Sequence, residues 1–356
     1  MAGEAPATPE QWASDYAQRR HVFQGYASRL ERLIGELLEE QDLDLVQIES
    51  RAKDVDSFVD KLKRRPGKYS DPIQEMRDLA GVRIICYYLS DVAIVGNLIE
   101  QEFVVDAENS WTRETRADVD RFGYASDHYV VSCTPTREGL PEWSAYTGIH
   151  AEIQVRTVLQ HAWAAIDHKL AYKRESDVPK QLRRQLSRVS ALLEVGDEQF
   201  EAVRSASQGL DASYDARARA GELEIPVDAS SLPAYLGDSD VVAALTAVAR
   251  EIGFTVEDRG STGIGELVNA SVAAGLSVLA DLDACLVESQ SWSVRALQAL
   301  WDARPSGAGW TMPVAFLLAT LVWIAVDTPL ETIAALANVD AFFTEALVAA
   351  RAARGE

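Results

Sequence analysis

Apolar positions in the first two hundred residues follow helical and strand-like patterns in turn. From Pro9 to Glu40, large apolar side chains recur every three or four residues, which predicts a long amphipathic helix. Residues 81–88 are β-branched and aromatic almost throughout, as expected of a central strand. Similar patterns predict strands at 45–50, 128–133 and 149–156, and helices at 54–65, 92–102, 158–172 and 178–205. This alternation predicts an α/β domain.

The strand at 149–156 has the most informative pattern. Its apolar residues alternate with the polar residues His150, Glu152, Gln154 and Arg156. A period of two places these four side chains on one face of a sheet. A carboxylate, an amide and a guanidinium on one face are typical of a site that handles metal and phosphate. A half-exposed strand with an incidental ion pair is the alternative interpretation.

The pattern changes after residue 205. Residues 206–232 are rich in Ala, Ser, Gly, Asp and Pro and predict a linker between domains. Residues 233–356 are rich in Ala, Leu and Val at helical spacing and predict a second, mostly α-helical domain. Its expected helices lie at 241–252, 264–285, 293–303, 313–326 and 329–354. Residues 1–8 are expected to form a flexible tail, which leaves 9–205 for the α/β domain.

Charge and cysteine content limit the classes of function. The net charge of −21 argues against binding to DNA or to a membrane surface, which requires a broad positive face. Three cysteines without a CxxC pair indicate a reducing, cytoplasmic setting and no zinc site. No signal peptide is apparent at the N-terminus. The longest apolar run, residues 311–326, contains Pro313 and favours a buried helix over a membrane span.

A cluster of basic residues follows the first predicted strand. Arg51 and Lys53 share a strand face, and Ser57 and Lys61 share a helix face. If the strand passes into the helix near Asp54, these four residues converge at a helix N-terminus, where backbone N–H groups favour anions. A polyphosphate pocket and a solvated basic helix face are both compatible with this cluster.

Two carboxylates are expected at neighbouring strands. Asp78 lies just before the strand at 81–88, and Gly81 permits a tight turn into it. A carboxylate in this place is a good Mg²⁺ ligand when a second carboxylate faces it, and Glu152 is the natural second. Such a pair is typical of nucleotidyl-transfer sites.

A third segment, Gly123-Tyr124-Ala125-Ser126-Asp127-His128, combines a flexible glycine with an aromatic ring. Gly123 lets the backbone bend, and Tyr124 is suited to stack on a base. His128 points into the strand that follows. A simple aromatic turn is the alternative interpretation.

Taken in order, four segments resemble the synthetase domain of the RelA/SpoT alarmone synthetases. They are RxK with Ser57 and Lys61, RDLAGVRI at 77–84, GYxSxHYVV at 123–131, and EIQVRT with HAWAAIDHKLAYK at 152–173. The resemblance covers residues 10–205 and implies a nucleotidyltransferase-like mixed sheet flanked by helices. The sequence contains no His-Asp dipeptide, so the similarity is to short forms that lack the family's hydrolase domain.

The resemblance implies transfer of pyrophosphate from ATP to the 3′-hydroxyl of GDP or GTP, with release of AMP. Asp78 and Glu152 would bind Mg²⁺, and Glu152 would help to deprotonate the hydroxyl. By position, ATP would be held by Arg51, Lys53, Ser57 and Lys61. The acceptor nucleotide would be bound by Arg121, Tyr124 and His128. The floor of the site would be supported by Arg83, Gln154 and Arg156.

One departure from the family pattern leaves the acceptor open. Many members carry a lysine three residues before the motif glycine, where this chain has Asp120 followed by Arg121. Either Arg121 substitutes for it, or the chain is a toxin-type member that pyrophosphorylates the 3′ end of tRNA. A nucleotide sensor without turnover is a further alternative, against which the intact Asp78 and Glu152 argue. The sequence does not decide the role of the C-terminal domain, and a homo-oligomer or a regulatory partner remains open.

Overall fold

In the computed structural model, which describes residues 8–41, 43–113, 126–171, 180–257, 262–304, 309–337, 339 and 341–355, the chain divides into two units. The first spans Met1–Val203 and the second Arg204–Glu356. Apart from Thr8, the predicted tail lies outside the described residues.

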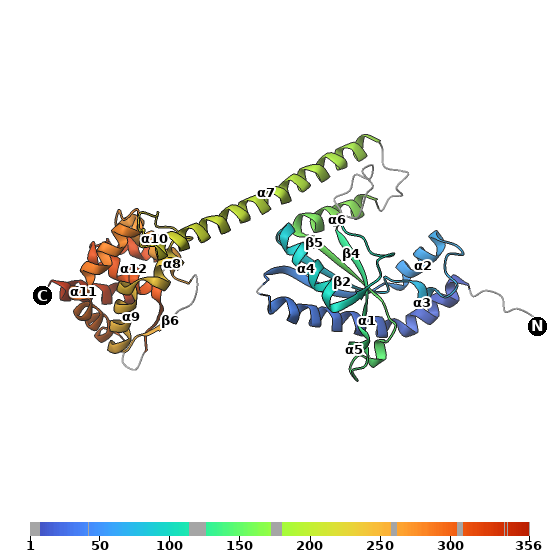
Figure 1. The fold of residues 1–356 in the computed structure, drawn as a ribbon, viewed down its shortest axis with the longest axis horizontal. Coiled ribbons are helices and arrows are strands. Elements are labelled where there is room, and N and C mark those ends of the chain that lie inside the picture. Colours follow the sequence, from blue (N-terminus) through green and yellow to red (C-terminus); the bar gives the residue numbers. More distant parts are fainter. Residues whose placement is uncertain are drawn as a thin grey trace, which may run out of the picture. The chain divides into compact units, whose positions relative to one another are not determined.

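A mixed sheet of five strands forms the centre of the first unit (Figure 1). Its strands are β1 (Leu45–Ala52), β2 (Ala80–Cys86), β3 (Phe103–Val105), β4 (Asp127–Cys133) and β5 (Ala151–Thr157), in the order β1-β2-β5-β4-β3. The central strand β5 pairs parallel with β2 and antiparallel with β4. The outer strands pair antiparallel, β1 with β2 and β3 with β4. The predicted mixed sheet is confirmed.

The core of this unit joins the apolar face of the sheet to two helices, α1 (Pro9–Glu39) and α4 (Leu89–Glu102). Thr8 and Gln11 form a capping box at the start of α1, with Pro9 in the first turn. Tyr16 and Leu30 from α1 are fully buried with Ile99 from α4 and Ile153 from β5. Burial of alternate strand residues here leaves the other alternate residues on the opposite, polar face.

Shorter elements complete the first unit. They are α2 (Val55–Arg64), α3 (Pro72–Glu75), α5 (Pro135–Glu138), η1 (Ser144–Tyr146) and α6 (Val158–Ala171). The helix α2 follows β1 after two residues, and α6 follows β5 directly. Both predicted strand-to-helix junctions are therefore present.

The second unit is mostly helical, as predicted. Its helices are α8 (Leu232–Asp238), α9 (Asp240–Ile252), α10 (Ile264–Ala273), α11 (Leu279–Asp302), α12 (Val314–Ala325), α13 (Leu330–Ala337) and α14 (Ala341–Arg354). Two three-residue strands, β6 (Thr255–Glu257) and β7 (Thr311–Pro313), pair in parallel, and these short strands were not predicted. Trp292 and Trp323 are buried in the core of this unit.

The predicted linker at 206–232 is wrong. The helix α7 (Lys180–Arg219) continues through the first half of this segment, and Ile225 and Leu232 are fully buried in the core of the second unit. Alanine is the best helix former, and the first left-handed residue after α7 is Gly221. The predicted helix at 264–285 is also two helices, because Gly275 adopts a positive φ of 73° between α10 and α11.

Within the described ranges, no helix combines the length and the apolar character needed to cross a bilayer. The apolar run at 311–326 forms β7 and the twelve-residue helix α12, which is almost entirely buried in the core of its unit.

Candidate active site

The polar face of the sheet carries two rows of residues set by strand register. Glu49 of β1 lies opposite Arg83 of β2, which lies opposite Gln154 of β5, which lies opposite His128 of β4. Two residues along the strands, Arg51, Gly81 and Glu152 form the corresponding row. The predicted alternation in β5 therefore places its polar side chains beside those of β1, β2 and β4.

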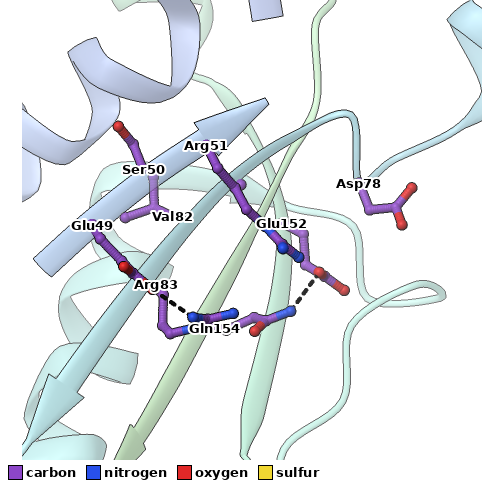
Figure 2. Close-up of a pocket in the computed structure, with 9 residues that line it drawn as sticks. Glu49, Ser50, Arg51, Asp78, Val82, Arg83, Glu152 and Gln154 are labelled. Atoms are coloured by element: carbon purple, nitrogen blue, oxygen red, sulfur yellow. Dashed lines mark hydrogen bonds and ion pairs between the residues drawn. The ribbon is translucent and has the colours of Figure 1, made fainter. Parts of the chain in front are cut away.

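A pocket of about 210 Å³ lies over these rows (Figure 2). The side chains at its wall are Glu49, Ser50, Arg51, Asp78, Val82, Arg83, Glu152 and Gln154, with Gly81 at its floor. Figure 2 shows the Arg51 side chain extending from β1 toward Glu152. Gly81 lies between Arg51 and Glu152 in the strand register and adds no side chain to this pocket.

Glu152 is held at both carboxylate oxygens. His128 Nδ1 lies 3.1 Å from Oε1, and the Gln154 amide donates to Oε2 at 2.8 Å. Burial alone would raise the pKa of Glu152, but the contacts with His128 and Gln154 outweigh it and hold the pKa below its ordinary value. The carboxylate is therefore ionised at neutral pH and already oriented.

Asp78 lies between two lysines, Lys53 in the junction between β1 and α2 and Lys61 on α2. Lys53 Nζ is 2.8 Å from Oδ2, and Lys61 Nζ is 2.8 Å from Oδ1. The Lys53 backbone N–H also donates to the carbonyl of Leu79, which fixes this junction beside Asp78. Burial would raise the pKa of Asp78, but the two ammonium groups outweigh it and lower the pKa.

Arginines form the rest of the polar face. Arg83 pairs with Glu49, and Arg156 donates to the side-chain amide oxygen of Gln154, Oε1. Arg156 is 5% exposed, and burial, followed by the charge of Arg83, lowers its pKa to about 10. Burial and the same two arginines lower the pKa of His161 on α6. Gln154 thus links the Arg156 guanidinium to the Glu152 carboxylate.

The structure brings most of the predicted site residues together. Lys53 and Lys61 meet at Asp78, and Arg51, Arg83 and Gln154 line the pocket with both carboxylates. Ser57 differs, because its side chain is exposed on α2 and does not line the pocket. Arg121 and Tyr124, together with Asp120, lie outside the described residues.

Two further residues of this face were missed from the sequence, Glu49 and Trp111. Glu49 was detectable, because it stands two residues before Arg51 and therefore shares its strand face. Trp111 gave no signal of this kind, because residues 106–121 are polar and charged and predict a long loop without a periodic pattern.

The carboxylates fit a Mg²⁺ ion that is shared with a substrate. No cluster of three or more His, Cys, Asp or Glu side chains with ligand geometry occurs among the residues described here. Asp78 and Glu152 line the same pocket, and Mg²⁺ commonly takes one or two carboxylates while phosphates and water complete its shell. This donor set is therefore suited to an ion that arrives with a nucleotide.

The fold and the site together define an α/β protein in which Asp78, Glu152 and two arginines line one pocket and two lysines contact Asp78, as expected of a phosphate-transferring enzyme. The sequence profile described as "Region found in RelA / SpoT proteins" matches residues 50–177. The chain belongs to the RelA/SpoT family, among its short alarmone synthetases.

Two relatives from Bacillus subtilis (strain 168) bear out this membership. The chain is 28% identical to GTP pyrophosphokinase YjbM over 177 residues, which cover 49% of this chain and 79% of that protein. It is 30% identical to GTP pyrophosphokinase YwaC over 159 residues, which cover 44% of this chain and 71% of that protein. Among solved structures, the small alarmone synthetase 1 from Bacillus subtilis aligns with a TM-score of 0.46 at 25% identity, over 55% of this chain and 98% of that one.

Proposed function

We propose that this chain transfers the pyrophosphoryl group of ATP to the 3′-hydroxyl of GDP or GTP and releases AMP. The observation that carries the proposal is that Asp78 and Glu152 line one pocket, with two lysines on Asp78 and two arginines on the wall. Membership of the RelA/SpoT family and similarity to two proteins named GTP pyrophosphokinases support the choice of reaction.

The donor nucleotide would occupy the β1 side of the pocket. Arg51 is exposed at the pocket wall, and its planar guanidinium is suited to stack on the adenine ring. Lys53 and Lys61, which neutralise Asp78 in the free chain, would turn to the phosphate oxygens of ATP. This exchange would release both oxygens of Asp78.

The acceptor hydroxyl would approach from the β5 side. Glu152 is ionised at neutral pH, so it can accept the hydroxyl proton without first losing its own. His128 and Gln154 fix the two oxygens of this carboxylate, so the direction in which it takes the proton is set before the substrates bind. Tyr124 and Arg121 would contact the acceptor base and phosphates.

Mg²⁺ would be held by Asp78 and Glu152 and would supply charge neutralisation on the transferring phosphates. The chain's own contribution is then largely positioning. Arg51 and the two lysines would orient the donor, and Glu152 would face the nucleophile, so that donor and acceptor meet in line.

The reaction can be tested with labelled ATP and unlabelled GDP or GTP, followed by separation of the products. We expect AMP and a pyrophosphorylated guanine nucleotide to appear in equal amounts. Glu152→Gln keeps the shape but removes charge and basicity, so turnover should fall by at least about a hundredfold. Glu102→Gln makes the same chemical change at a carboxylate that pairs with Arg137 away from the pocket, and it should retain turnover.

Either of two results would contradict this proposal and indicate a different function. AMP release that requires added tRNA would indicate a tRNA-modifying toxin. Nucleotide binding without AMP release under any of these conditions would indicate a sensor.

A further inference from the structure

An aromatic stack covers one face of the His128 ring. The Trp111 and His128 rings lie with their centroids 4.2 Å apart and their planes 18° from parallel. The same two residues exchange both backbone hydrogen bonds, with N···O distances of 2.9 and 2.8 Å. Trp111 is therefore fixed to β4 at the residue whose side chain it covers.

The covered ring is engaged at both nitrogens. Nδ1 lies 3.1 Å from Glu152 Oε1, and Nε2 lies 2.9 Å from Ser126 Oγ. Rotation of the imidazole in its plane or out of the stack would break both contacts. Because His128 holds one of the two oxygens of Glu152, the orientation of that carboxylate depends on the orientation of the ring.

The backbone beside Trp111 has attachments of its own. The Arg113 N–H donates to Asp127 Oδ1 at 2.7 Å, and the Val130 N–H donates to Ser110 Oγ at 2.8 Å. These bonds do not involve the indole. A change in the Trp111 side chain should therefore remove the stack and leave the segment in place on β4.

We propose that Trp111 is a positioning residue for the transfer reaction, acting through His128 on the Glu152 carboxylate. Trp111 does not line the pocket, and its stack on the His128 ring is the contact through which it would act on Glu152. This inference rests on the function proposed above for Glu152.

A double-mutant cycle tests the inference. Trp111→Leu should lower kcat about three- to tenfold, the range expected for loss of one aromatic stack, and leave KM for ATP unchanged. Trp111→Phe should recover most of the loss, because a flat ring is restored. In a His128→Ala background, Trp111→Leu should have no further effect, since residues that act as one unit are not additive.

The matched control is Trp143→Leu, an identical change in the core of the same unit, where Trp143 packs against Tyr26. It should lower the melting temperature and act additively with His128→Ala. If Trp111→Leu also acts additively with His128→Ala, or changes KM for ATP alone, the inference is overturned.

A measurement that does not depend on turnover can test this inference independently of the proposed function. The ring protons of His128, assigned by comparison with His128→Ala, should be shifted upfield in the NMR spectrum by the indole ring current. Trp111→Leu should abolish that shift and alter the ring nitrogen signals. Unchanged His128 signals in Trp111→Leu would overturn the inference, even in a chain that transfers no pyrophosphate.

Discussion

Gly81 adds no side chain to the pocket that it lines. Gly81 stands between Arg51 and Glu152 in the register of the sheet, and any larger residue would project into the space between them. A Cβ atom there would meet its nearest neighbour, the Glu152 carbonyl oxygen, at 3.6 Å, which is ordinary van der Waals contact. The backbone of Gly81 does not have a positive φ angle either. The backbone at this position therefore does not require glycine, but a side chain here would take up space in the pocket.

Gly81→Val should consequently weaken the binding of ATP without destabilising the fold. Valine is favoured in strands, so the melting temperature should stay close to that of the parent chain. Its two methyl groups would occupy the pocket, and KM for ATP should rise about tenfold or more, with Gly81→Ala in between. Steady-state kinetics and thermal melting followed by circular dichroism check both expectations. A large loss of stability with unchanged KM would contradict this role for Gly81.

Residue types and spacing were enough to single out Asp78, Glu152, Lys53 and Lys61 as candidate site residues. Glu152 lies on β5 and Lys61 on α2, where local periodicity sets the direction of the side chain, and Asp78 and Lys53 lie just before β2 and directly after β1. Trp111 was not predictable in this way. Its partner is 17 positions along the chain, and an isolated bridge between the two residues has no local periodic signature. Strand register, which a single sequence does not reveal, decides such contacts.

At the scale of elements, the carboxyl end of β5 is hydrogen-bonded to α7. Thr157, the last residue of β5, donates its hydroxyl to Asp197 Oδ2 at 2.6 Å, and Asp197 is 1% exposed. Gln160 and Thr157 exchange two further hydrogen bonds at the start of α6. The strand that carries Glu152 is thus anchored at its carboxyl end by a buried carboxylate.

Asp197 should make stability depend on pH. Burial, opposed by the charge of Arg113, raises the pKa of Asp197 to about 6 from an ordinary value of 3.8. Between these values the folded chain keeps a proton that the unfolded chain has lost. The contribution of Asp197 to the free energy of unfolding therefore falls as pH rises from about 4 to about 6.

Asp197→Asn keeps an acceptor for Thr157 and removes this titration. At neutral pH the variant should be more stable than the parent by about 1–3 kcal/mol, and the difference should vanish near pH 4. Urea unfolding at several pH values measures this difference, in which the titration of all other groups cancels. Parallel pH profiles for the two chains would show that Asp197 does not titrate as described.

Elements with one buried face were the most predictable. The range predicted for the first helix, 9–40, differs from α1 by one residue, because its apolar stripe and its capping signals agree. The segment at 206–232 failed for the opposite reason. Its alanines and serines carry no apolar stripe, so composition suggested a linker, while helix propensity and burial of Ile225 and Leu232 decide the structure.

At the scale of the whole molecule, charge is distributed unevenly. The chain has a net charge of −21, but Arg51, Arg83 and Arg156 lie on the neighbouring strands β1, β2 and β5, and Lys53 and Lys61 contact Asp78 at the pocket. Asp78 pairs with both lysines and Glu49 pairs with Arg83, so an anionic ligand would have to displace these internal partners to reach the positive groups. Composition alone therefore excludes broad polyanion binding but cannot reveal a compact phosphate site.

Every residue of the candidate site lies in the first unit, which has a hydrophobic core of its own. A chain that ends at Ala206 should therefore fold, stay soluble and transfer pyrophosphate from ATP with a kcat comparable to that of the full chain. The second unit would then have a regulatory or partner-binding role, visible as a change in the response to effectors and not as loss of turnover. Circular dichroism establishes that the shortened chain is folded, and AMP release measures its activity. A folded but inactive shortened chain would show that the second unit completes the site.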